Sequence, residues 1–119
     1  MKPGARILVI DDNREFRSIL KTVLEGKGFQ VFEADDGEDA LALMSTTAVQ
    51  MAIVDLDMPR MNGIEFSREA KAKYPKLPIM MVTAFAQFYT PAEILSSGVD
   101  AFLHKPVDLE TLGKAIDRM

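Results

Sequence analysis

The sequence predicts an α/β fold, a doubly wound five-stranded parallel sheet with helices on both faces. Apolar runs alternate with amphipathic stretches along all 119 residues, which indicates strands alternating with helices. The apolar runs are continuous in Val, Ile, Met and Leu, as is typical of strands covered on both sides. Right-handed crossovers leave few strand orders, and the order 2-1-3-4-5 sets the first and third strands side by side.

The first strand is predicted over Arg6–Ile10, a buried apolar run. Either Asp12 or Asn13 can cap the helix that follows, which runs from Arg14 to about Lys27. The apolar residues of this helix recur at spacings of three and four, so they share one face. They are Phe16, Ile19, Leu20, Val23 and Leu24.

The second strand is predicted over Gln30–Ala34, and a turn at Asp35-Asp36-Gly37 leads to a helix around Leu41 and Met44. The next apolar run, Met51–Val54, is the third strand. Beyond it, proline and glycine mark 57–63 as a loop before the third helix. That helix is expected to run from Ile64 to about Tyr74.

The fourth strand is Ile79–Thr83, bounded on its amino side by two prolines. A threonine followed by proline at Thr90-Pro91 is a good helix start, and this short helix is expected to end at Gly98. The fifth strand runs from Ala101 to about His104. Asp108 can cap a last helix.

Composition limits the classes of function. A chain of this length fits one domain, 1–119, and 48% hydrophobic with 27% charged residues is typical of a globular protein. The net charge of −4, without a basic stripe, disfavours direct nucleic-acid binding. No cysteine is present, and no apolar run has the length of a membrane span or a signal peptide. The expected location is the cytoplasm.

Charged side chains follow three of the predicted strands. Asp11 and Asp12 come after the first strand, Asp55 after the third, and Lys105 after the fifth. The carboxyl ends of parallel strands are where open α/β sheets bind ligands. Three carboxylates and one ammonium gathered there predict a small site for a metal ion and a phosphoryl group.

The same positions, with matching spacing along the whole chain, resemble the receiver domain of two-component response regulators. The residues that carry the resemblance are Asp11-Asp12, Asp55 followed by Met58-Pro59 and Gly63, Thr83-Ala84, and Lys105-Pro106. The resemblance implies that Asp55 accepts a phosphoryl group from a phosphohistidine on a partner, a histidine kinase or phosphotransfer protein. The chain would then be a phospho-acceptor that at most catalyses its own phosphorylation and dephosphorylation, and not an enzyme.

The resemblance also assigns the remaining site residues. Asp11, Asp12 and Asp55 would bind Mg²⁺ or Mn²⁺, together with the backbone carbonyl of Asp57. Thr83 and Lys105 would bind the phosphoryl group. Phe102 takes the place of the aromatic residue that rotates inward on activation, when the surface of the fourth helix, fifth strand and fifth helix changes partners. The Lys105-Pro106 peptide bond is expected to be cis.

Two other functions compete with this one. Asp55-Leu-Asp57 looks like the start of the motif of haloacid-dehalogenase-type phosphatases, although Pro59 and the lack of a cap domain argue against such an enzyme. The other is a binding module that keeps the fold but is never phosphorylated.

Three aromatic residues, Phe85, Phe88 and Tyr89, either fill the core or form a surface for a homodimer or partner. The kinase, the pathway and any output domain cannot be read from the sequence.

Overall fold

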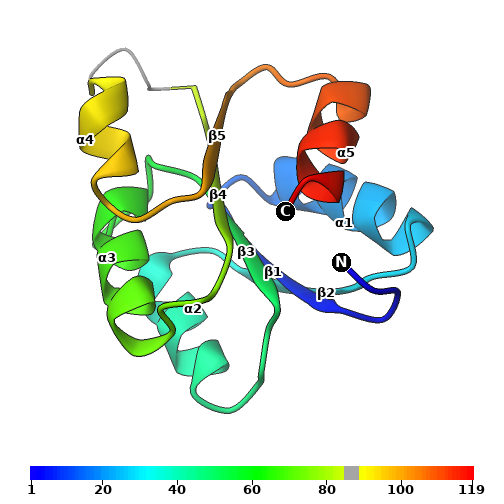
Figure 1. The fold of residues 1–119 in the computed structure, drawn as a ribbon, viewed down its shortest axis with the longest axis horizontal. Helices are drawn as coiled ribbons and strands as arrows, with labels where there is room; N and C mark the ends of the chain where they lie inside the picture. The colour runs from blue at the N-terminus through cyan, green and yellow to red at the C-terminus, as the bar shows by residue number, and fades with distance from the viewer. Residues whose placement is uncertain (85–88) are drawn as a thin grey trace.

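The computed structural model describes residues 1–84 and 89–119, where strands and helices alternate as predicted (Figure 1). In chain order the elements are β1 (Arg6–Ile10), α1 (Arg14–Gly26), β2 (Gln30–Ala34), α2 (Gly37–Met44), β3 (Met51–Val54), α3 (Gly63–Lys73), β4 (Ile79–Thr83), α4 (Pro91–Leu95), β5 (Ala101–His104) and α5 (Leu109–Asp117). The strands are all parallel in the order β2-β1-β3-β4-β5, which confirms the predicted fold class.

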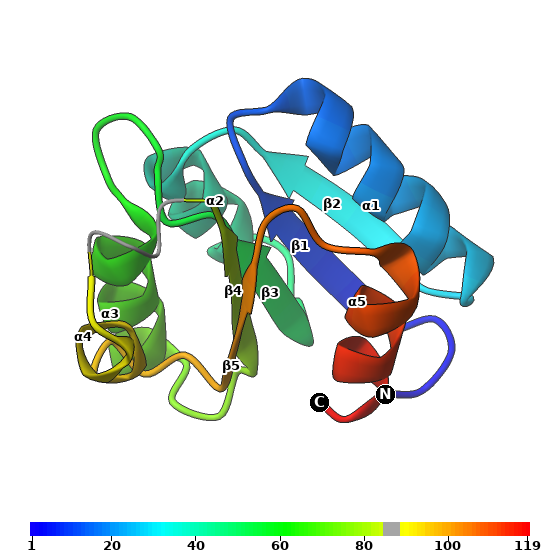
Figure 2. The ribbon, with the colours of Figure 1, turned by 90° about the horizontal axis from the view of Figure 1, so that it is seen from above.

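Two apolar layers, one on each face of the sheet, form the core. Helices α1 and α5 cover one face, and α2, α3 and α4 cover the other (Figure 2). Strand β1 alternates between them: Ile7 and Val9 face α1 and α5, whereas Leu8 and Ile10 face the opposite layer. Because β1, β3 and β4 are buried on both faces, their sequences read as continuous apolar runs.

Element ends differ from the prediction by a few residues, for local reasons. Asn13 caps α1, not Asp12, and its side chain accepts the N–H of Phe16. Helix α3 begins one residue early, at Gly63, because the preceding asparagine makes a capping box there. Helix α4 ends at Leu95, short of Gly98, which has a left-handed φ of 95° and lies beyond the last turn.

The chain ends lie at the edge of the sheet opposite the carboxyl ends of the strands. The first residues enter β1 at its amino end, and Gly4 N donates to Gly28 O across the start of β2. Helix α5 starts beyond the carboxyl end of β5 and runs back, so Met119 returns to the same edge as the N-terminus (Figures 1 and 2). Among the described residues, no helix has the length and apolar character needed to cross a lipid bilayer.

Candidate functional site

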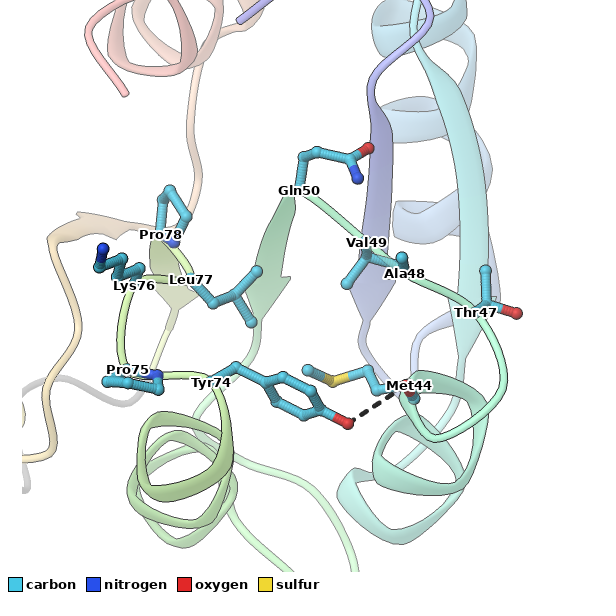
Figure 3. A pocket seen from close by; sticks show the side chains of 10 residues that line it. All are labelled: Met44, Thr47, Ala48, Val49, Gln50, Tyr74, Pro75, Lys76, Leu77 and Pro78. Carbon is cyan, nitrogen blue, oxygen red and sulfur yellow. Dashed lines mark hydrogen bonds between the residues drawn. The ribbon is translucent and has the colours of Figure 1, made fainter.

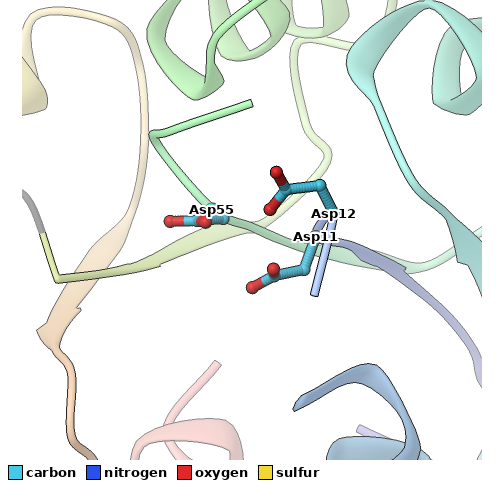
Figure 4. Close-up of side chains that lie close together, drawn as sticks. All are labelled: Asp11, Asp12 and Asp55. Carbon is cyan, nitrogen blue, oxygen red and sulfur yellow. The ribbon is translucent and has the colours of Figure 1, made fainter. Parts of the chain in front are cut away.

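Five predicted site residues meet at the carboxyl edge of the sheet. Asp11 and Asp12 follow β1, Asp55 follows β3, Thr83 ends β4, and Lys105 follows β5. The first three form a tight group, with one carboxylate oxygen of each within 4.8 Å of the others (Figure 4). The strand order produces this meeting, because it places β1 between β2 and β3 and so brings two distant aspartate positions together.

Lys105 completes the group from the β5 side. Its Nζ lies 2.8 Å from Asp11 Oδ2 and 3.7 Å from Asp55 Oδ2. Its backbone N–H donates to the carbonyl of Thr83 at 2.8 Å, which fixes the chain as it leaves the sheet. The Lys105–Pro106 peptide bond is cis. The ammonium therefore pairs with two members of a group of three carboxylates, so one positive charge stands against up to three negative charges.

Two of the three aspartates are buried, so the repulsion between their carboxylates is only weakly screened by water. Asp11 is 2% exposed and Asp55 6% exposed, whereas Asp12 faces solvent. Burial, and then the neighbouring charge of Asp11, raise the pKa of Asp55 to about 6. Lys105, the backbone N–H of Asp57 and the Thr83 side chain lower that pKa, but only in part. A free carboxylate at this position is thus destabilised at neutral pH unless a cation binds beside it.

The donor set fits a hard divalent cation. Asp55 Oδ1 is buried and makes no hydrogen bond with the described residues, so it is available as a ligand. The grouped donors are carboxylate oxygens, which Mg²⁺ and Mn²⁺ prefer over softer ligands. Two unit charges about 4 Å apart interact by roughly 4 kcal/mol at an effective dielectric near 20. A bound dication therefore offsets substantial repulsion within the Asp11, Asp12 and Asp55 group.

The remaining predicted residues that the structure describes lie outside this group. Asp57 is exposed, its carboxylate lies outside the acidic group, and its backbone N–H helps to lower the pKa of Asp55. Phe102 is half-buried on β5 and packs against the layer under α2, α3 and α4. Tyr89 also packs against that layer, which favours a core role for this aromatic. Phe85 and Phe88 lie outside the described residues.

Two residues of α1 contact the site and were not predicted to do so. Phe16, predicted only as part of the apolar face, places its ring 4.1 Å from Lys105 Nζ. Arg17 donates from Nη1 to the carbonyl oxygen of Asp11 at 2.5 Å and from Nε to Glu33 at 3.2 Å. The signal that could have found both is their place in the first turn of the helix that starts directly after the aspartate pair.

A hollow at the opposite edge of the sheet and a second acidic group lie outside this site. A hollow of about 440 Å³ at the opposite edge is lined by apolar side chains, among them Met44, Val49 and Leu77 (Figure 3). Its tyrosine hydroxyl, from Tyr74, already donates to the carbonyl of Met44 at 3.2 Å. A second acidic group includes Asp36, whose carboxylate caps α2 and pairs with an arginine, so turn chemistry accounts for it.

Magnesium is expected to stabilise the folded domain through the acidic group. At a concentration about 100 times its dissociation constant, a ligand that binds only the folded state adds about 2.7 kcal/mol, or roughly 10 °C in melting temperature for this size. Differential scanning fluorimetry with and without MgCl₂ measures the shift. Asp12→Asn should remove most of it, whereas Asp35→Asn, in the second acidic group, should keep it. Equal shifts in both variants would place the ion elsewhere.

Comparisons with known proteins agree with the fold. Residues 7–117 match the family described as response regulator receiver domain. The transcriptional regulatory protein ZraR of Salmonella typhimurium is 36% identical over 112 residues, which cover 94% of this chain and 25% of that protein. The response regulator MprA of Mycolicibacterium vanbaalenii is 36% identical over 107 residues, 90% of this chain and 46% of that protein.

Solved structures give the same result. A CheY-like receiver domain protein from Methanospirillum hungatei JF-1 superposes with a TM-score of 0.92 at 30% identity, covering 97% of this chain and 92% of that one. The chemotaxis response regulator CheY4 of Vibrio cholerae gives 0.88 at 31% identity, covering 97% and 98%. Receiver domains act as phospho-acceptors and not as true enzymes. With its sheet order, its aspartate group and these matches in accord, the chain belongs to the response regulator receiver domain family.

Proposed function

We propose that the protein is a phosphorylation-controlled signalling switch in which Asp55 accepts a phosphoryl group from a histidine kinase or phosphotransfer protein. One observation carries the proposal: Asp55 is buried, its Oδ1 makes no hydrogen bond with residues 1–84 or 89–119, and it lies among Asp11, Asp12 and Lys105 at the carboxyl edge of the sheet. A nucleophilic oxygen surrounded by charge-stabilising groups is what phosphoryl transfer requires, because the reaction needs mainly positioning and neutralisation of charge.

The transfer itself is a simple exchange of bonds. An oxygen of Asp55 forms a bond to phosphorus as the phosphorus–nitrogen bond of a phosphohistidine breaks, and the imidazole leaves with the electron pair. Lys105, 3.7 Å from Asp55 Oδ2, is positioned to pair with the transferred group, and Thr83 to donate a hydrogen bond to it. Both reduce the charge that develops on the phosphoryl oxygens.

A divalent cation belongs to this proposal. Carboxylates of Asp11, Asp12 and Asp55 and the backbone carbonyl of Asp57 would hold Mg²⁺ or Mn²⁺. When bound, the ion supplies positive charge that offsets the phosphoryl oxygens. The protein residues keep their own part: Asp11 also binds the ammonium of Lys105, and so links the metal ligands to the opposite side of the site.

The output of the switch depends on β4 and β5. Phosphorylation adds a charge of about −1.5 to −2 and new acceptor oxygens at Asp55. Thr83 would move toward them, and Phe102, now half-buried, would turn inward into the space that opens. This changes the surface formed by α4, β5 and α5. Because a ligand shifts an equilibrium only through differential binding, the partner must prefer one form of this surface.

The wider assignment is also a proposal. We treat 1–119 as a single receiver domain, and the partner of its phosphorylated form is either a separate protein or an attached output region. The second possibility draws on the relatives, since the chain spans 25% of the transcriptional regulatory protein ZraR. The sequence also suggested a homodimer formed through Phe85, Phe88 and Tyr89. Two of these three residues lie outside the described residues, so the described structure does not support the homodimer.

Acetyl phosphate with MgCl₂ is expected to phosphorylate the domain on Asp55. Intact-mass spectrometry should show one added phosphoryl group on the wild type and none on Asp55→Asn, because the amide is a poor nucleophile. Asp57→Asn, an exposed carboxyl two residues away, is the matched control and should still be labelled. A phosphoryl group on Asp55→Asn would show that another residue is the acceptor.

The competing functions give different results in the same preparation. A phosphatase with Asp55 as nucleophile would turn over p-nitrophenyl phosphate steadily, whereas a receiver domain should release almost no nitrophenol. A module that is never phosphorylated would bind Mg²⁺ and yet take no label from acetyl phosphate. Labelling without phosphatase turnover therefore separates the proposed switch from both alternatives.

A further inference from the structure

An aromatic ring covers one side of the lysine in the site. The ammonium of Lys105 lies 4.1 Å from the centroid of the Phe16 ring, within the range of a cation–π interaction. Phe16 is half-buried on α1, and the Lys105 side chain is 18% exposed, so solvent weakens the contact only in part. Within the described part of the chain, the ammonium thus interacts with the carboxylates of Asp11 and Asp55 and with this ring.

Four contacts close a circuit through the first turn of α1. The Oδ1 atom of Asp11 accepts the N–H of Asn13 at 2.9 Å, and Oδ1 of Asn13 accepts the N–H of Phe16 at 3.1 Å. The Phe16 ring then meets Lys105, and Lys105 Nζ donates to Oδ2 of Asp11 at 2.8 Å. The cap that starts the helix therefore also fixes the place of the ring relative to the ammonium.

We propose that Phe16 is a positioning residue for Lys105, and that its ring face holds the ammonium beside the Asp55 phosphoryl position. The inference rests on the proposed function. Asp11, at 2.8 Å, competes with Asp55, at 3.7 Å, for the same ammonium. A ring face attracts a cation electrostatically without accepting a strong directional hydrogen bond. The N–H groups of Lys105 that do not bond to Asp11 can therefore turn toward phosphoryl oxygens while the side chain stays in place.

The chain offers a ring-deleting variant, a ring-keeping variant and a neighbouring control. Phe16→Leu keeps an apolar side chain but removes the ring face, and Phe16→Tyr keeps the face. Phe16 and Ile19, one turn further along α1, both line a hollow of about 500 Å³ that Lys105 also lines. Ile19 is 49% exposed and has no ring face to offer the ammonium. Ile19→Ala therefore changes the hollow while the Phe16 ring beside Lys105 stays.

The first measurement is spectroscopic and needs no phosphorylation. In protein labelled with ¹³C-lysine, the ε-methylene protons of Lys105 are expected upfield of those of exposed lysines, because they lie over the ring. The upfield shift should disappear in Phe16→Leu and remain in Phe16→Tyr and Ile19→Ala. If wild-type Lys105 shows no such shift, the proposal is wrong, whether or not the variants fold.

The second measurement is the rate of phosphorylation by acetyl phosphate, a small donor that needs no protein docking surface. Phe16→Leu is expected to react about three- to thirtyfold more slowly, the range of a partly desolvated cation–π contact. Phe16→Tyr and Ile19→Ala should stay within about twofold of the wild type. A wild-type rate in Phe16→Leu, a slow Phe16→Tyr, or an equally slow Ile19→Ala would each overturn the proposal.

The two measurements also separate this inference from the function beneath it. If the wild type takes no phosphoryl group but shows the upfield shift of Lys105, the proposed function fails and the contact with Phe16 stands. If the wild type is phosphorylated and the shift is absent, the function stands and the positioning role of Phe16 fails.

Discussion

Asp55→Asn is expected to raise the free energy of unfolding of the metal-free domain at pH 8 by about 1–3 kcal/mol. The wild-type carboxylate is buried beside Asp11, and its pKa is raised to about 6 from an ordinary value of 3.8. An amide of the same shape removes that unfavourable charge. Chemical denaturation at pH 8 without magnesium gives the difference. Asp57→Asn, at an exposed position of the same loop, should change stability by no more than about 0.5 kcal/mol.

The gain from Asp55→Asn should depend on pH in a defined direction. Between pH 3.8 and about 6 the folded protein keeps the Asp55 proton while the unfolded chain releases it, given the raised pKa. The wild type therefore loses stability as pH rises through this window, and the variant does not. The two proteins should converge below pH 4. A difference that is the same at pH 4 and pH 8 would mean that the charge of Asp55 is not its cause.

Gly63→Ala is expected to destabilise the fold by about 3 kcal/mol or more, with loss of magnesium binding. A β-carbon at Gly63 would lie 2.5 Å from the carbonyl oxygen of Asp55 and 2.9 Å from the α-carbon of Leu56. These are backbone atoms, so the clash can be relieved only by moving the segment that carries Asp55, the proposed phospho-acceptor. Denaturation curves and the magnesium-dependent thermal shift would show both effects.

Gly26→Ala is the matched control for that substitution. Gly26 is the last residue of α1, and no heavy atom of another described segment lies within 4 Å of the position its β-carbon would take. Alanine is favoured over glycine in a helix, so the variant should be as stable as the wild type or more stable by up to about 1 kcal/mol. If Gly63→Ala and Gly26→Ala were equally stable, a clash between a β-carbon at position 63 and the Asp55 backbone could not be the reason for a glycine there.

Most of the fold follows from the sequence because the sheet is buried on both faces. Strands β1, β3 and β4 are runs of apolar residues with no polar alternation, and that pattern fixes both their type and their place in the centre. Helix ends were less predictable. Helix α4 is only five residues long, so its end at Leu95 depends on local turn geometry and not on periodicity.

The charged residues of the carboxyl-edge site could be predicted, because each follows a strand directly. The contact of Phe16 was missed, because it depends on the direction of a side chain. Asp11, Asp55 and Lys105 come after separate strands, so the strand order alone brings them together. Phe16 belongs to a helical apolar face, and nothing in a spacing of three and four distinguishes a ring that packs in the core from one that meets an ammonium. Only three-dimensional placement does that.

Both chain ends lie at the edge of the sheet farthest from Asp55. A tether at either end should therefore leave the group of Asp11, Asp12 and Asp55 facing solution. On a biosensor chip, the protein could be immobilised through an affinity tag at Met1 or at Met119. Either attachment would then leave the same face of the protein open to a kinase in solution. Matching association rates from the two orientations would show that the kinase approaches from the aspartate side.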